Sequence, residues 1–126
     1  MAESGVPADD AGRVETAGGA VALRDHEGTC VLTVSGALDL ALAPQLRRLV
    51  ERAARTRAPV LVIDLSAVDF LASAGMAVLV WAHRLAEPAD VRVVASGRLT
   101  LRPLELTRLT DELALFPSLP AALEGV

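Results

Sequence analysis

The run Val60-Leu61-Val62-Ile63-Asp64-Leu65 decides the fold, because every position except Asp64 is apolar. A strand with one solvated face alternates apolar and polar residues, whereas a strand inside a parallel sheet is covered on both faces and reads as a continuous apolar run. We therefore predict that residues 60–65 form the central strand of a sheet with helices on either side.

The sequence around this strand alternates between strand and helix patterns. Further strands are predicted at residues 21–24, 30–35, 91–95 and 113–116, and helices at about 44–55, 74–85, 101–109 and 118–124. A polar turn joins the first two strands as a hairpin, and Gly36-Ala37-Leu38-Asp39 breaks the second of them. This order predicts an α/β fold with a mixed, mostly parallel sheet of four to five strands and about four helices.

The length and the composition predict one folded domain. The 126 residues suit a single domain, and the 52% hydrophobic content supplies an aliphatic core. Residues 1–19 are rich in Ala, Gly, Asp and Ser and show no apolar period, so they cannot bury enough surface to order themselves. We therefore predict a flexible tail over residues 1–19 and a folded domain over residues 20–126.

The composition also argues against two classes of partner. Aromatic residues are scarce and the net charge is -4, so the chain has little to stack on bases and repels phosphate backbones. No apolar run approaches the ~20 residues of a membrane span, and the N-terminus lacks the pattern of a signal peptide. We predict a cytoplasmic protein that binds another protein, with no nucleic-acid and no membrane partner.

Catalytic chemistry is not indicated by the sequence. Glycine-rich phosphate loops, nucleophile motifs and zinc-ligand spacings do not occur, and Cys30 stands alone in an apolar run. His26 falls in a predicted turn and His83 in a predicted helix, too far apart for a proton-transfer pair. We therefore predict no enzymatic activity, no metal site and no cofactor.

The segment after the central strand carries the functional signal. Parallel strands that end near Ser35 and Leu65 deliver the following residues to one edge of the sheet, where open α/β folds place their sites. Asp39 and the loop 69–75 should therefore be neighbours, although Asp39 can equally serve as a turn or helix cap. Ser73 falls where its hydroxyl can cap the next helix, and where a phosphate would also be accommodated by free N–H groups and the helix dipole.

This segment resembles a known signature. Asp64-Leu65-Ser66-Ala67-Val68-Asp69-Phe70-Leu71-Ala72-Ser73-Ala74-Gly75-Met76 is similar to the pattern D-L-S-x-V-x-F-[ML]-D-S-[ST]-G-[LM] of STAS-domain anti-sigma-factor antagonists. Gly36-Ala37-Leu38-Asp39 resembles that family's G-E-[IL]-D segment, and residues 93–117 resemble the tail of actinobacterial members. The resemblance spans about residues 21–123 and implies the STAS fold.

The resemblance also implies a function and a site. In that family, an anti-sigma factor with a kinase-like ATPase fold binds the unphosphorylated antagonist and releases its sigma factor. Phosphorylation by the same kinase then frees the antagonist, and a PP2C-type phosphatase resets it. The resemblance implies that Ser73 is the phosphoacceptor and that Asp39 assists its recognition. The implied partner-binding residues are Asp39, Ala72, Ser73, Ala74, Gly75 and Met76.

Two departures from the family pattern keep an alternative open. Ala72 and Ala37 stand where the family carries acidic residues, which bears on phosphorylation more than on partner binding. The alternative is a STAS module that docks on a partner constitutively, without a phosphate cycle. A nucleotide-binding module is a third interpretation, but no glycine-rich phosphate loop supports it.

Overall fold

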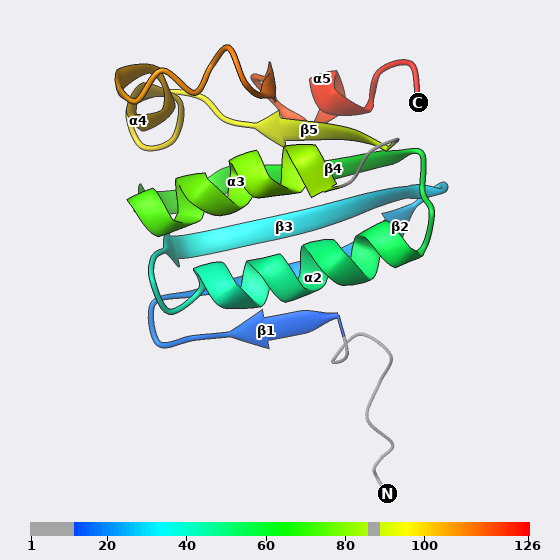
Figure 1. The fold of residues 1–126 in the computed structure, drawn as a ribbon, viewed down its shortest axis with the longest axis horizontal. Coiled ribbons are helices and arrows are strands. Elements are labelled where there is room, and N and C mark those ends of the chain that lie inside the picture. Colours follow the sequence, from blue (N-terminus) through cyan, green and yellow to red (C-terminus); the bar gives the residue numbers. More distant parts are fainter. Residues whose placement is uncertain (1–11, 86–88) are drawn as a thin grey trace, which may run out of the picture.

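The computed structural model describes residues 12–85 and 89–126. Its centre is a six-stranded sheet in which the strands lie side by side in chain order, from β1 to β6. Figure 1 shows α2 and α3 lying next to each other across one face of this sheet. The strands are β1 (Arg13–Glu15), β2 (Gly19–His26), β3 (Thr29–Leu38), β4 (Val60–Leu71), β5 (Asp90–Val94) and β6 (Ala114–Phe116), and the helices are α2 (Ala43–Arg55), α3 (Ser73–Leu85), α4 (Leu101–Leu106) and α5 (Leu119–Leu123).

The sheet is mixed, as the sequence predicts. β1, β2 and β3 pair in antiparallel fashion, whereas β3, β4, β5 and β6 pair in parallel. The predicted hairpin is confirmed by β2 and β3, and the predicted edge strand by β6. The predicted number of strands, four to five, is too low, because the sheet has six strands and the prediction omits β1.

β4 is the central strand, and its two faces pack against different helices. Leu61 and Ile63 belong to the main core under α2 and α3. Val62, which points the other way, belongs to a second cluster that is closed by α5 through Ala122. Alternate residues of a strand face opposite sides of a sheet, so burial of both sets explains the unbroken apolar run.

The tail predicted over residues 1–19 is too long. Arg13–Glu15 form β1, and β2 begins at Gly19, so the ordered chain starts before residue 20. The start of β2 is tightly packed, because a Cβ at Gly19 would lie 2.6 Å from the carbonyl oxygen of Ser35. In the sequence Gly18 and Gly19 indicate flexibility, whereas in the fold the absence of side chains permits close backbone contact. Residues 1–11 lie outside the described residues.

Both strands that lead to the predicted site are longer than expected. β3 continues through Gly36-Ala37 to Leu38, and β4 continues to Leu71 instead of ending at Leu65. Their register shifts at two places, between Thr33 and Ser35 and between Gly36 and Ala37. Gly36 has φ +73°, which an L side chain rarely adopts. The glycine therefore marks an irregularity inside the strand and not its end.

Arg92 of β5 fastens the C-terminal helix to the sheet. Its Nη1 donates to the carbonyl oxygens of Ala122 (2.8 Å) and Glu124 (3.2 Å), at the end of α5. Its Nε donates to Asp90 at 2.9 Å, and its guanidinium lies 5.4 Å from the ring centroid of Phe116. A short helix of this kind depends on tertiary contacts for its stability.

Replacing Arg92 with Met keeps the aliphatic stem and removes the guanidinium. We expect amide exchange of residues 119–123 to accelerate and the free energy of unfolding to fall by about 1–3 kcal/mol, because two carbonyls lose their charged donor. Mass-spectrometric hydrogen exchange measures the first effect and urea denaturation the second. Arg98→Met, in an exposed turn, is the control, and unchanged exchange in Arg92→Met would contradict this role.

Candidate functional site

The predicted site residues meet where β3 and β4 end, at the carboxyl ends of these two parallel strands. Leu38 and Leu71 are paired in the parallel ladder. Ala72, the residue that follows β4, donates its N–H to the carbonyl oxygen of Leu38 at 3.0 Å. Asp39 and Ser73 therefore leave adjacent strand ends, which confirms that the two segments are neighbours.

Ser73 is the first residue of α3 and is exposed to solvent. The carbonyl oxygen of Ala72 accepts the first helical bond, from Met76 N–H at 3.1 Å, so Ala72 occupies the capping position expected for Ser73. Within the described residues, the Ser73 hydroxyl makes no hydrogen bond. The N–H groups of the first helical turn have no acceptor inside the helix. The hydroxyl is therefore free for modification beside a cluster of donors.

Asp39 is engaged in the local structure. Its Oδ1 accepts hydrogen bonds from the N–H groups of Ala41 (3.1 Å) and Leu42 (3.0 Å), and its carbonyl oxygen accepts from Ala43 N–H (2.9 Å). These contacts order the turn that leads into α2, because an Asp side chain that accepts from backbone N–H groups two and three residues on fixes the turn. Asp39 thus fills the turn role that its position allows and is half-buried, while the N-cap of α2 is Leu42, which has no side-chain cap.

Two residues expected on the docking surface are buried. Gly75 packs directly on Leu38: a Cβ at position 75 would lie 2.6 Å from Leu38 Cγ and 2.9 Å from its carbonyl oxygen. Met76 is 9% exposed, and its sulfur lies 3.5 Å from the Thr107 hydroxyl. The expectation that Met76 offers apolar surface to a partner is corrected here, because its side chain points into the core between α3 and α4.

The contact of Gly75 with Leu38 predicts the sign of a mutational effect. Glycine to alanine inside a helix normally stabilises by about 1 kcal/mol through helix propensity. At position 75 we expect destabilisation, because overpacking against a fully buried leucine costs about 1–3 kcal/mol. Urea denaturation of Gly75→Ala measures the change, and Ala77→Ser, on the exposed face of α3, is the control. A gain in stability would contradict the close packing.

A groove between α2 and α3 opens beside Ser73. Leu40, Ala43, Pro44 and Arg47 form one wall, and Ala74, Ala77, Val78 and Trp81 form the other, around a volume of about 340 Å³. The Arg47 guanidinium lies 4.4 Å from the ring centroid of Trp81, which is cation–π geometry. Trp81 is half-buried: one side of it packs on the core and the other lines the groove.

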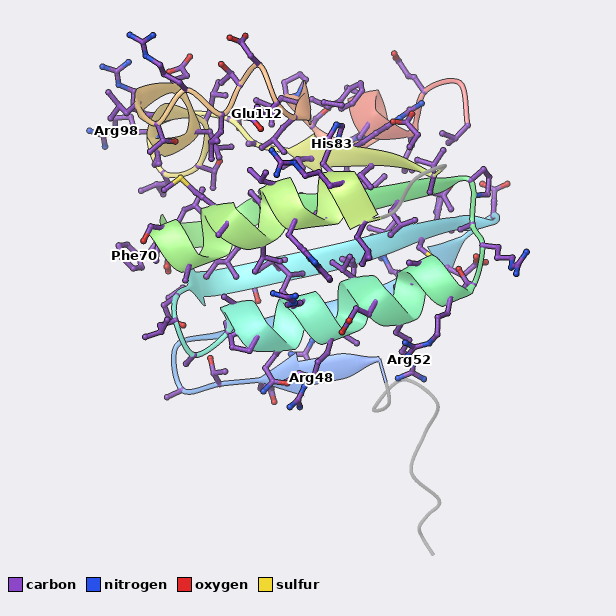
Figure 2. The ribbon with its side chains drawn as sticks, in the orientation of Figure 1. Arg48, Arg52, Phe70, His83, Arg98 and Glu112 are labelled. Atoms are coloured by element: carbon purple, nitrogen blue, oxygen red, sulfur yellow. The ribbon has the colours of Figure 1, made fainter. Side chains whose placement is uncertain are left out.

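Two exposed apolar residues lie at the end of the sheet where α3 begins, and the sequence did not indicate them. Leu40 is 78% exposed and Phe70 is 55% exposed. Figure 2 shows Phe70 at the end of the sheet where α3 begins. Leu40 is followed by three apolar residues and Phe70 by two, so the sequence does not indicate that either side chain is exposed. Their exposure depends on the turn ordered by Asp39 and on the length of β4, which no local pattern reveals.

Other kinds of site find little support in the described part of the chain. There, no group of three His, Cys, Asp or Glu residues is placed to hold a metal ion. Among the described helices none is long and apolar enough to cross a membrane. Asp64 faces away from α3 and accepts from Ser66 N–H at 2.9 Å, which is a role within its own strand.

The mixed sheet, the two helices on one face and the exposed serine at the start of α3 are the features to compare with known protein families. The chain belongs to the STAS domain family, which it matches over residues 20–122. The resemblance drawn from the sequence and the predicted α/β fold are thereby confirmed.

Within this family, the chain is similar to several proteins named as anti-sigma factor antagonists. The chain is 37% identical over 107 residues to the anti-sigma-F factor antagonist RsfB of Mycobacterium tuberculosis, covering 84% of this chain and 88% of RsfB. An anti-sigma factor antagonist of Mycobacterium paratuberculosis superposes with a TM-score of 0.77 at 39% identity, covering 82% and 89% of the two chains. SpoIIAA in its unphosphorylated form shares the fold, with a TM-score of 0.63 at 14% identity over 79% of this chain and 90% of SpoIIAA.

Proposed function

We propose that this chain is an anti-sigma factor antagonist that binds an anti-sigma factor and thereby frees a sigma factor. The observation that carries the proposal is the exposed edge at Ser73, flanked by apolar side chains, in a chain 37% identical to an anti-sigma-F factor antagonist over most of its length. The anti-sigma factor carries the kinase-like ATPase fold that the family resemblance implies. The function lies in this docking surface and not in catalysis.

The docking surface consists of the exposed residues at this edge. We define it as Leu40, Phe70, Ser73, Ala74 and Ala77 together with the groove residues Arg47 and Trp81. Leu40 is 78% exposed and lines the groove together with Ala74 and Trp81, and Phe70 is 55% exposed. Exposed apolar side chains that gather into one patch mark an interaction site. Small side chains at Ala72, Ala74 and Ala77 permit close approach of a second backbone, while Arg47 and Trp81 are residue types enriched in binding hot spots.

Phosphorylation of Ser73 would switch this surface. A phosphate adds roughly 1.5–2 negative charges. The free N–H groups of the first turn of α3 can donate to its oxygens without unfolding of the helix. Docking of an apolar partner surface would then require desolvation of a dianion. Because the Ser73 hydroxyl makes no bond to the rest of the described chain, its modification alters the surface and leaves the fold intact. A PP2C-type phosphatase would restore the binding state.

The switch predicts opposite behaviour for two variants of Ser73. Incubation with the cognate anti-sigma factor and ATP should add one phosphate to the wild-type chain, seen by intact mass, and none to Ser73→Ala. Ser73→Ala should still form the complex. Ser73→Glu should bind at least tenfold more weakly, a loss of at least about 1.4 kcal/mol, because the added charge must be desolvated on docking. Calorimetry or interferometry measures the affinities.

The same experiment separates the switch from constitutive docking. Ala72 and Ala37 replace the acidic residues of the family signature, and this is the observation that favours the constitutive alternative. A complex that forms with no phosphate transfer would establish a docking module that is regulated elsewhere. Absence of both complex and phosphate with every kinase-like anti-sigma factor of the same organism would overturn the proposed function.

An exposed leucine tests the docking surface independently of phosphorylation. Leu40→Asp should weaken the complex at least tenfold, because an apolar anchor is replaced by a charge that must be desolvated. The free energy of unfolding should change by less than about 0.5 kcal/mol, since Leu40 is 78% exposed. Leu85→Asp, at the far end of α3, is the matched control and should bind as the wild type. Equal affinities for both variants would place the interface elsewhere.

A further inference from the structure

β1 leaves one edge of the sheet open among the described residues. The carbonyl oxygen of Gly12 accepts from Leu23 N–H at 2.6 Å, and Thr16 N–H donates to the carbonyl of Gly19 at 2.8 Å. Hydrogen-bonded pairs alternate along an antiparallel ladder, so residues 12, 14 and 16 face β2 with their backbone groups. Arg13 and Glu15 therefore direct their N–H and C=O groups away from the sheet, where an added strand would bond.

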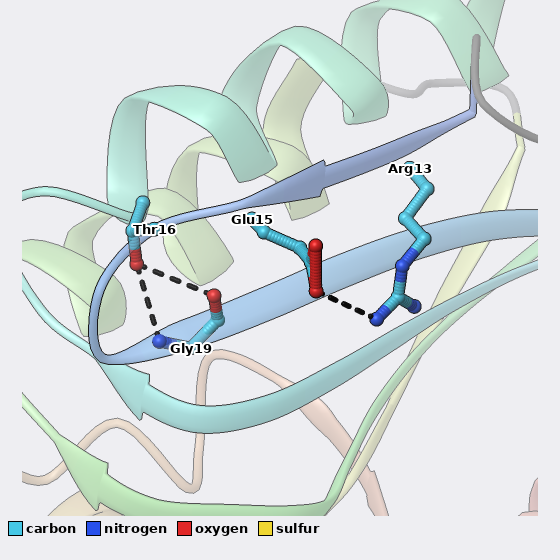
Figure 3. A network of polar contacts seen from close by, with 4 residues as sticks. All are labelled: Arg13, Glu15, Thr16 and Gly19. Carbon is cyan, nitrogen blue, oxygen red and sulfur yellow. Dashed lines mark hydrogen bonds and ion pairs between the residues drawn. The ribbon is translucent and has the colours of Figure 1, made fainter.

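The turn next to this edge is held in place. Figure 3 shows Thr16 Oγ1 in contact with both backbone groups of Gly19, at 3.2 Å from its nitrogen and 3.3 Å from its oxygen. It also shows the ion pair between Arg13 Nη2 and Glu15 Oε2, 3.2 Å apart on one face of β1. Val14 points to the opposite face and packs on the core. β1 thus presents a fixed template.

A basic groove runs along this edge on the side of α2. Its floor is Val14 and Leu49, its volume is about 370 Å³, and its remaining lining residues are Gln45, Arg48, Glu51, Arg52 and Arg55. Figure 2 shows Arg48 and Arg52 reaching from α2 toward β1. Arg48 and Arg55 line the groove with one glutamate, and the ion pairs of the described residues include neither of them.

The charge of the groove suits an acidic strand. Alternate residues of a strand point to the same face, so every second side chain of a strand added beside β1 would lie over the groove. Carboxylates at these positions would face Arg48 and Arg55, while the strand's backbone bonds to the outward groups of Arg13 and Glu15.

We propose that the β1 edge and the basic groove beside it bind an acidic, extended segment of a partner protein, which is added to the sheet as a seventh strand. Backbone bonds supply the pairing and the arginines select acidic side chains. A second copy of this chain is disfavoured, because antiparallel pairing of two β1 edges would place two arginine rows side by side. The surface lies apart from Ser73, so this proposal does not depend on the proposed function.

A synthetic peptide of alternating glutamate and valine is the probe, with an alternating lysine and valine peptide as its counterpart. Titration of the full, isotope-labelled chain should shift the amides of Arg13 and Glu15 with the acidic peptide only. Arg48→Glu with Arg55→Glu should weaken binding at least tenfold, because like charges then face each other. Arg98→Glu with Arg108→Glu makes the same charge change elsewhere and should bind as the wild type.

A backbone variant tests the strand geometry. Glu15→Pro removes an outward N–H and no bond to β2, so it should abolish binding and leave the fold intact. Glu15→Gln, which keeps the N–H, should bind as the wild type. Equal binding by both charge-reversed pairs, shifts confined to other residues, or no binding of the acidic peptide would overturn the proposal. Binding to phosphatidylglycerol vesicles without peptide binding would overturn it as well, since that identifies a lipid surface.

Discussion

The contact between Leu38 and the first turn of α3 is the constraint on which the rest of the site depends. Ala72 N–H bonds to the Leu38 carbonyl at 3.0 Å, and Gly75 leaves no room for a side chain above Leu38. These contacts join the end of β3, the end of β4 and the start of α3 at one point. Because Asp39 follows Leu38 and Ser73 follows Ala72, both site residues have positions that are set by packing in the core.

This arrangement separates what must stay fixed from what can change. Gly75, Met76 and the Asp39 carboxylate are buried or bonded, and they hold the start of both helices in place. Ser73 is exposed and makes no hydrogen bond within the described residues. A charge added at Ser73 therefore acts on the proposed docking surface and not on the fold. Partner switching by a single modification requires this division.

The sequence predicted the parts of the fold that arise from local patterns. The apolar run of β4 indicated its central place, and the helical spacing of residues 46–54 indicated α2. β1 escaped prediction because a three-residue strand has no detectable period, and Gly36 looked like a strand end because a register shift depends on the neighbouring strand. The signature around Ser73 predicted the place of the proposed site, but exposure of Leu40 and Phe70 and burial of Met76 follow from tertiary packing, which spacing in the sequence does not encode.

Mapping the interface with an anti-sigma factor tests the central claim most directly. The isotope-labelled chain, titrated with the unlabelled partner in the absence of ATP, reports each amide that the complex perturbs. We expect perturbations concentrated at residues 39–47 and 70–81, with Arg48, Arg52 and Arg55 of the basic groove unaffected. Perturbations concentrated on α4, β6 or α5, with the amides around Ser73 unchanged, would contradict it.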